Sequence, residues 1–422
     1  MTKLVTTIFF CLLTVFSYGQ DTIQQINTTR INSKDQQKKP YVILISADGF
    51  RYDYAEMYKA THLLALAKQG VTAEALIPSY PSITFPNHYS IVTGMYPAHH
   101  GLVGNGFYDK KVGRSYYYKG PTTTEAVWYG GTPLWVLAEQ QQMLTASFYW
   151  VASEAPIQGI LPTYYYHYNE KMAIADRIQK IKNWLLLSDE KRPHLITVYF
   201  PEVDKTGHKQ GPDAPETERS VRLIDSAVYE MTKAVKSTGL NVNFIFLSDH
   251  GMTNVSHNIA IELPAIDTAK FITAFENSII NIYAKSASKG DIGALYNALK
   301  QGAYNYKVFL RSAVPESLRY DTKNDRYGRV GDIVLMPDHP YVFLPKSKKV
   351  DPGAHGYDPD KVKDMHATFM AWGPNIKKGL TIPTFRNVNV YPIVTKILGL
   401  KQTAKIDGAD EVAKKIVSPP AP

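Results

Sequence analysis

The chain has 422 residues, of which 44% are hydrophobic and 12% aromatic, a composition that excludes an intrinsically disordered protein and allows a large core. The net charge of +9 favours anionic ligands, but the basic residues are scattered, so we expect no nucleic-acid duplex as a partner. The length fits either two or three domains or one large α/β domain with insertions.

The first 19 residues have the features of a secretory signal peptide. One lysine precedes an apolar run from Leu4 to Phe16, and small or polar residues follow it. This run is too short for a stable membrane span, so we expect residues 1–19 to be cleaved and the protein to be exported, either periplasmic or secreted. An uncleaved N-terminal anchor is the alternative. The single cysteine, Cys11, lies in this segment, so the remaining chain would contain no disulfide.

Apolar runs and amphipathic segments alternate from residue 40 onward. The runs at 41–46, 194–200 and 242–248 are typical of strands buried on both faces of a sheet. This order predicts an α/β fold with a mostly parallel central sheet flanked by helices. The preceding residues 20–39 are polar without periodicity, and they predict a flexible leader.

One stretch of the chain has a different pattern. Residues from about 268 to 345 combine short strand signals with one helical segment, which predicts a small α+β insertion in the larger domain. We place that larger domain at residues 40–405 and a C-terminal tail at 406–422, whose last residues should fray.

Carboxylates and histidines follow the ends of the three apolar runs. Because the carboxyl ends of parallel strands meet at one edge of a sheet, these side chains should lie close together. Carboxylate and imidazole ligands without thiolate indicate zinc or a similar divalent ion, and three Asp with three His exceed one tetrahedral site, so two metals are expected. The six candidate ligands are Asp48, Asp204, His208, Asp249, His250 and His355.

Thr84 stands directly before a predicted helix that Pro86 would begin. The free N–H groups and the dipole at a helix amino end favour an anion such as phosphate. A metal on the threonine oxygen would lower the pKa of the hydroxyl and create a nucleophile at neutral pH. A simple helix cap is the alternative role for Thr84. We leave His88 out of the ligand set, because packing or hydrogen bonding explains it more simply.

Six ordered motifs carry a resemblance to a known family. They are "ISADGFRYDY", "PSITFPNHYSIVTGMYPAHHGLVGNGFYD", "EAPIQGILPTYYYHYN", "YFPEVDKTGH", "LSDHGM" and "AHGYD". Together they resemble the nucleotide pyrophosphatase/phosphodiesterase family, a branch of the alkaline phosphatase superfamily, in the form of a bacterial-type single catalytic domain. The resemblance covers the chain from about Tyr41 to the segment "NVNVYPIVTKILGL" and implies the alkaline phosphatase-like fold.

The resemblance also implies a role for each candidate residue. Two Zn²⁺ ions would be the cofactors, and Thr84, bound to the second ion, would be the nucleophile. Asn105 would donate to a nonbridging phosphate oxygen, and Phe85 and Tyr168 would sandwich a nucleobase. The family's ligand pattern assigns the first zinc to Asp204, His208 and His355, and the second to Asp48, Asp249 and His250.

By the same resemblance the protein would be a metal-dependent phosphodiesterase that releases nucleoside 5′-monophosphates from nucleotide diesters and pyrophosphates through a phosphothreonine. No Lys or Arg occurs between Lys119 and Lys171, which favours diesters over the more highly charged monoesters. The alternatives are a phospholipid or choline-type head-group phosphodiesterase of the same family, a phosphomonoesterase of the superfamily, and a non-catalytic metal- and phosphate-binding protein. The sequence makes no prediction of the oligomeric state.

Overall fold

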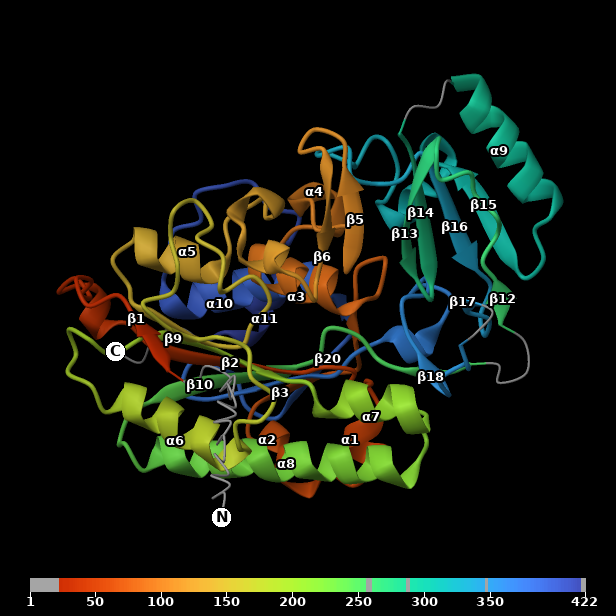
Figure 1. Ribbon diagram of the computed structural model, residues 1–422. Coiled ribbons are helices and arrows are strands. Elements are labelled where there is room, and N and C mark those ends of the chain that lie inside the picture. Colours follow the sequence, from red (N-terminus) through yellow and green to blue (C-terminus); the bar gives the residue numbers. More distant parts are fainter. Residues whose placement is uncertain (1–22, 256–259, 286–288, 346–347, 419–422) are drawn as a thin grey trace, which may run out of the picture.

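A nine-stranded sheet forms the centre of the protein (Figure 1). The computed structural model describes residues 23–255, 260–285, 289–345 and 348–418, so the expected signal peptide lies outside the described residues. The strands follow the order β1-β8-β7-β9-β2-β10-β19-β3-β20. They are β1 (Gln24–Ile26), β2 (Tyr41–Ala47), β3 (Val71–Ala73), β7 (Thr145–Phe148), β8 (Tyr164–Tyr166), β9 (Leu195–Phe200), β10 (Val242–Leu247), β19 (Phe369–Trp372) and β20 (Leu380–Ile382).

The three apolar runs of the sequence form the adjacent strands β9, β2 and β10, which pair in parallel. Strand β19 runs antiparallel to both of its neighbours, and β1 is antiparallel to β8. The predicted α/β class with a mostly parallel sheet is therefore confirmed. Side chains alternate along β2, with Val42 and Leu44 in one core and Ile43 and Ile45 in the other, as expected for a strand covered on both faces.

Helices cover both faces of the sheet (Figure 1). One layer contains α3 (Thr84–Thr93), α5 (Leu134–Gln140), α10 (Val390–Leu398) and α11 (Glu411–Ile416). The opposite layer contains α1 (Tyr54–Met57), α2 (Thr61–Lys68), α6 (Ile174–Leu185), α7 (Glu202–Gln210) and α8 (Pro215–Lys236). The amphipathic pattern of α8 buries Val221, Ile224 and Val228 against the sheet, which explains its length. None of the helices in the described part of the chain is both long and apolar enough to cross a membrane.

A second, smaller sheet lies beside the main one (Figure 1). Its order is β13-β14-β16-β15, all antiparallel, and it has its own apolar core with the helix α9. This is the small α+β insertion that the sequence predicts. Its elements are β13 (Phe271–Glu276), β14 (Ile279–Ala284), α9 (Lys289–Gln301), β15 (Tyr306–Leu310) and β16 (Ile333–Pro337).

Short elements connect these parts. They are α4 (Pro97–His100) and the strand pairs β4 (Leu76–Ile77) with β21 (Phe385–Arg386), β5 (Gly106–Asp109) with β6 (Arg114–Tyr117), β11 (Thr253–Asn254) with β18 (Gly353–Ala354), and β12 (Ile261–Glu262) with β17 (Phe343–Leu344).

The segments at both ends of the described chain are ordered. In the leader, β1 pairs with β8, and the buried Asn32 side chain bonds to the backbone of residues 144, 189 and 192. The prediction of a flexible leader is therefore wrong for residues 23–39, because backbone and amide hydrogen bonds replace the missing apolar periodicity. In the tail, α11 buries Ala413 and Ile416 in the core, whereas residues 419–422, at the end that is expected to fray, lie outside the described residues.

Candidate active site

The candidate ligands lie at the carboxyl edge of the central sheet. Asp48 follows β2, and Asp249 and His250 follow the neighbouring strand β10. Their ligand atoms lie within 4.8 Å of one another. All three side chains are buried. Two adjacent parallel strands therefore deliver one group of three potential ligands, as the sequence pattern predicts.

A second group comes from α7 and a loop. Asp204 and His208 are four residues apart on α7, hence on the same face, and their ligand atoms lie within 4.8 Å of that of His355. The helix approaches β2 closely, because the N–H of Asp204 donates to the carbonyl of Asp48 at 2.9 Å. Gly49 makes this possible: its φ is +70°, and a Cβ there would lie 2.8 Å from the Cα of Asp204.

The pairing of β11 with β18 brings His355 to the site from a distant part of the chain. The rings of His250 and His355 stack, with centroids 3.6 Å apart, so the two groups of ligands are contiguous. The structure thus assembles all six candidate ligands into the two sets of three that the sequence interpretation named.

The three histidines are oriented by backbone carbonyls. The Nδ1 atoms of His208, His250 and His355 donate to the carbonyl oxygens of Gly353, Gly251 and Ser82 at 2.9, 2.8 and 2.9 Å. This arrangement fixes Nδ1 as the protonated nitrogen and turns each Nε2 toward the centre of the site, as is usual for histidines that bind metals.

Carboxylate oxygens without hydrogen bonds face these Nε2 atoms. Oδ1 of Asp48, Oδ1 of Asp204 and Oδ2 of Asp249 are buried and accept no hydrogen bond. Nε2 of His250 lies 3.4 Å from the Asp48 oxygen and 3.1 Å from the Asp249 oxygen. Nε2 of His208 and of His355 lie 3.4 and 3.5 Å from the Asp204 oxygen.

The lone pairs of each group converge on one region, where a cation would satisfy them. Burying unpaired carboxylates is costly, and an N/O ligand set of this kind suits zinc or a similar divalent ion. The residues therefore fit the metal that the motifs imply.

Burial and crowding also perturb the charges of the site. Burial raises the pKa of Asp48 well above its usual range, and the nearby carboxylates of Asp249 and Asp204 raise it further. Burial likewise raises the pKa of Asp249, but His250 and His88 outweigh this effect, so the pKa of Asp249 is lowered. Burial, followed by His250 and His208, lowers the pKa of His355 well below its usual value, which keeps the imidazole neutral and its Nε2 lone pair free.

Thr84 lies at the group formed by Asp48, Asp249 and His250. Its Oγ1 is 3.3 Å from Nε2 of His250. The helix α3 begins at Thr84 itself, so Pro86 occupies the third position and not the expected first one. Thr84 is consequently in the first turn, where N–H groups lack partners within the helix. The hydroxyl therefore lies beside the candidate metal ligands at the amino end of a helix.

Asn105 contacts the residue after Thr84. Its Oδ1 accepts a hydrogen bond from the N–H of Phe85 at 3.0 Å, which leaves its NH₂ group as the remaining donor. The backbone of Asn105 is held in turn: the carboxylate of Glu276 accepts hydrogen bonds from the N–H groups of Asn105 and Gly106. The insertion, through β13, thus supports the residue that was predicted to contact phosphate.

Phe85 and Tyr168 pack against different aromatic clusters. The Phe85 ring is half-buried against Tyr118, with centroids 5.4 Å apart. The Tyr168 ring is 44% exposed and packs on Tyr149 and Tyr199 at 5.4 and 6.2 Å. Both rings retain free surface, as a stacking role requires, although they are held by separate parts of the chain.

Two further residues lie against the candidate ligands, and of these only Tyr199 was missed by the sequence analysis. The hydroxyl of Tyr199 donates to Oδ2 of Asp48 at 2.6 Å. His88 is buried, with its Nε2 2.8 Å from Oγ of Ser46 and its Nδ1 3.0 Å from the carbonyl oxygen of Thr84; Oδ2 of Asp249 lies 3.2 Å from the same Nδ1. His88 therefore hydrogen-bonds to Ser46 and to the backbone of Thr84 beside a candidate ligand, consistent with its exclusion from the ligand set. Tyr199, which lies near the end of β9 beside β2, could have been suspected only from the strand order.

Comparisons with known proteins identify the family. The family model "Type I phosphodiesterase / nucleotide pyrophosphatase" matches residues 42–358. The chain belongs to this family. It is 34% identical over 378 residues to an uncharacterized pyrophosphatase/phosphodiesterase of Schizosaccharomyces pombe, covering 85% of this chain and 77% of the relative. It is 32% identical over 366 residues to human bis(5′-adenosyl)-triphosphatase ENPP4, covering 86% and 79%.

A solved structure supports the same assignment. Murine ectonucleotide pyrophosphatase/phosphodiesterase 5 superposes with a TM-score of 0.83 at 30% identity and covers 90% of this chain and 100% of its own. An inactive variant of that protein, with one threonine changed to alanine, was solved in complex with AMP. Some family members are larger: the chain spans 44% of the venom phosphodiesterase of Naja atra. The protein is therefore a hydrolase of the nucleotide pyrophosphatase/phosphodiesterase family, with the alkaline phosphatase-like fold.

Proposed function

We propose that this family member is an exported two-zinc phosphodiesterase that hydrolyses nucleotide diesters and pyrophosphates to nucleoside 5′-monophosphates. The placement of Thr84 carries the proposal, because its hydroxyl lies at the start of α3 and 3.3 Å from Nε2 of His250. The unpaired oxygens of Asp48, Asp204 and Asp249 support two cation sites. The AMP complex of the murine relative supports a nucleotide as substrate.

In the proposed reaction, Oγ1 of Thr84 attacks phosphorus, and the bond between phosphorus and the leaving-group oxygen breaks on the opposite side. Water then attacks the phosphothreonine ester and releases the nucleoside 5′-monophosphate and free Thr84. When bound, the two zinc ions would neutralise charge on the attacking and leaving oxygens and lower the pKa of hydroxyl and water. The NH₂ group of Asn105 would hold a nonbridging oxygen, and the exposed faces of Phe85 and Tyr168 would hold the base.

The test is a comparison of two substrates on the purified protein. We expect kcat/KM for thymidine 5′-monophosphate p-nitrophenyl ester to exceed that for p-nitrophenyl phosphate by about a hundredfold or more, which is ~3 kcal/mol of transition-state discrimination. A zinc chelator should abolish the activity, and added Zn²⁺ should restore it. Preference for the monoester would contradict the proposal, and retained zinc without hydrolysis of either ester would indicate a binding protein.

A further inference from the structure

The loop that carries Tyr168 is fixed to the metal-binding helix α7 by an ion pair. The Tyr168 hydroxyl bonds to Oε1 of Glu170 at 3.1 Å. Oε2 of the same carboxylate lies 2.6 Å from Nζ of Lys205. Lys205 directly follows the candidate ligand Asp204 on α7. One chain of contacts therefore connects the exposed Tyr168 ring with the helix that positions part of the metal site.

The other end of the loop is held separately. Glu154 accepts a hydrogen bond from the N–H of Tyr168 at 3.1 Å, and its second oxygen lies 2.5 Å from Nδ1 of His167. Glu154 thus fixes the backbone, whereas the contact through Glu170 fixes the tip of the ring. Two attachment points of this kind determine where the face of an aromatic ring lies.

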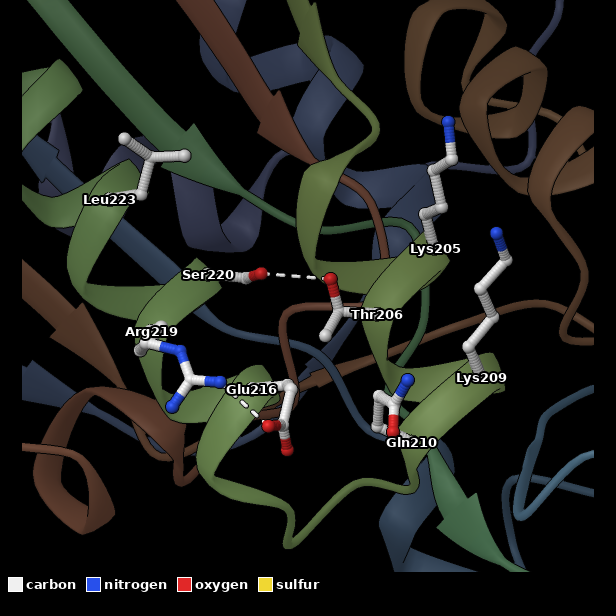
Figure 2. Close-up of a pocket in the computed structure, with 8 residues that line it drawn as sticks. All are labelled: Lys205, Thr206, Lys209, Gln210, Glu216, Arg219, Ser220 and Leu223. Carbon is white, nitrogen blue, oxygen red and sulfur yellow. Dashed lines mark hydrogen bonds and ion pairs between the residues drawn. The ribbon is translucent and has the colours of Figure 1, made fainter.

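Lys205 also borders a neighbouring surface hollow, but its ammonium group contacts Glu170. A surface hollow of about 400 Å³ between α7 and α8 is lined by Lys205, Lys209 and Arg219, among others. Figure 2 shows Lys205 and Lys209 extending from one side of α7, whereas Thr206 faces Ser220 across the hollow. The hydrogen bond from Lys205 lowers the pKa of Glu170, so the carboxylate is charged at neutral pH.

We propose that the Lys205–Glu170 ion pair is a specificity device that positions Tyr168 to stack on the nucleobase. Lys205 and Glu170 are then positioning residues, and the inference rests on the proposed nucleotide function. The pair is exposed, with 55% and 45% of the two side chains accessible, so its loss should change the stability of the fold little. Its effect should instead appear in the recognition of substrates that contain a base.

The experiment compares substrates with and without a base. The substrates are thymidine 5′-monophosphate p-nitrophenyl ester and methyl p-nitrophenyl phosphate, which carry the same charge and leaving group. In Lys205→Gln we expect KM for the thymidine ester to rise about three- to tenfold with kcat within about twofold of the wild type. For the methyl ester, kcat/KM should keep its wild-type value.

Two further variants separate positioning from general electrostatics. Lys209→Gln removes the same charge one turn later on the same side of α7, and it should leave both substrates unaffected. Lys205→Arg retains the ion pair and should restore the wild-type KM. An equal loss on both esters in Lys205→Gln, or no loss on either, would overturn the inference.

The outcome is distinguishable from failure of the proposed function. If the wild type hydrolyses neither ester, the proposed function fails. The role of Lys205 is then tested without turnover, by calorimetry of the binding of AMP, which carries a base, and of ribose 5-phosphate, which does not. Weaker binding of AMP alone in Lys205→Gln would support the inference. Equal binding of AMP by the variant and the wild type, including no binding by either, would overturn it.

Discussion

The phenol of Tyr199 donates a 2.6 Å hydrogen bond to Oδ2 of Asp48 and leaves Oδ1 directed at Nε2 of His250, 3.4 Å away. This contact orients a candidate ligand from outside the metal site. Residues with this role are typically worth about 10- to 100-fold in metal affinity.

We therefore expect Tyr199→Phe to weaken zinc binding by about 10- to 100-fold, measured by competition with a chromogenic chelator. The matched control is Tyr164→Phe, which removes a 2.8 Å hydrogen bond from a similarly buried phenol to the carbonyl of Lys191. Equal zinc affinity in the two variants would exclude Tyr199 as a support of the site.

Thr84 should be separable from the metal ligands by mutation. Thr84→Ala removes the proposed nucleophile but none of the six Asp and His ligands, so zinc content should persist while kcat falls on the order of a thousandfold or more. Elemental analysis and steady-state kinetics on the same preparation test both parts. Thr84→Ser keeps a hydroxyl and should retain measurable turnover. Full activity in Thr84→Ala would remove Thr84 from the mechanism.

The strand ends could be predicted from the sequence because two simple regularities determine them. Long apolar runs mark buried parallel strands, and polar residues directly after such strands gather at one edge, which is how Asp48 and Asp249 were found. The helix that Pro86 predicts pointed to Thr84, and the six motifs then added Asn105. Contacts between side chains that are distant in sequence leave no such signal, as in Tyr199 with Asp48, 151 residues apart, or Lys205 with Glu170, 35 residues apart.

In the leader, the sequence predicted too little order. Polar residues without periodicity predict flexibility, since periodicity reports only apolar burial. The amide group of Asn32 instead fixes the segment by hydrogen bonds to the backbone of distant residues. Composition does not indicate hydrogen bonds of this kind.

Glu276 should make stability depend on pH. Burial raises its pKa from the ordinary 4.5 to about 8, although hydrogen bonds from the backbone of Gly106 and Asn105 act in the opposite direction. Between these two values the unfolded chain binds fewer protons than the folded protein, so this group makes stability fall as the pH rises through the window.

Glu276→Gln removes this ionisation. We expect the melting temperature of the variant minus that of the wild type to increase as the pH rises from 5 to 8. Above that range the difference should change little. The exposed Glu56→Gln serves as the control and should show no such trend. A difference between Glu276→Gln and wild type that is independent of pH would contradict the assignment of a raised pKa to Glu276.

Asn32 should be a stabilising residue of the fold even though it lies in a polar segment. Its amide donates to the carbonyls of Asp189 and Arg192 at 2.8 and 2.7 Å, and its Oδ1 accepts from the N–H of Leu144 at 2.7 Å. The side chain is 1% exposed, so Asn32→Ala would leave these three backbone groups buried without partners. Since each unpaired group costs about 1–3 kcal/mol, partly relieved by water, we expect a loss of about 2–4 kcal/mol in the free energy of unfolding.

Denaturant titration against Asn27→Ala tests this expectation. Asn27 lies in the same segment, but its side chain is exposed and accepts hydrogen bonds from Thr29 alone, while its backbone bond to Thr163 survives the substitution, so its variant should match the wild type. Because Asn32 joins the segment to both β7 and the loop before β9, its loss should also release β1 from β8 and accelerate proteolysis within residues 23–39. Equal stability of the two variants would show that the Asn32 side chain does not stabilise the fold.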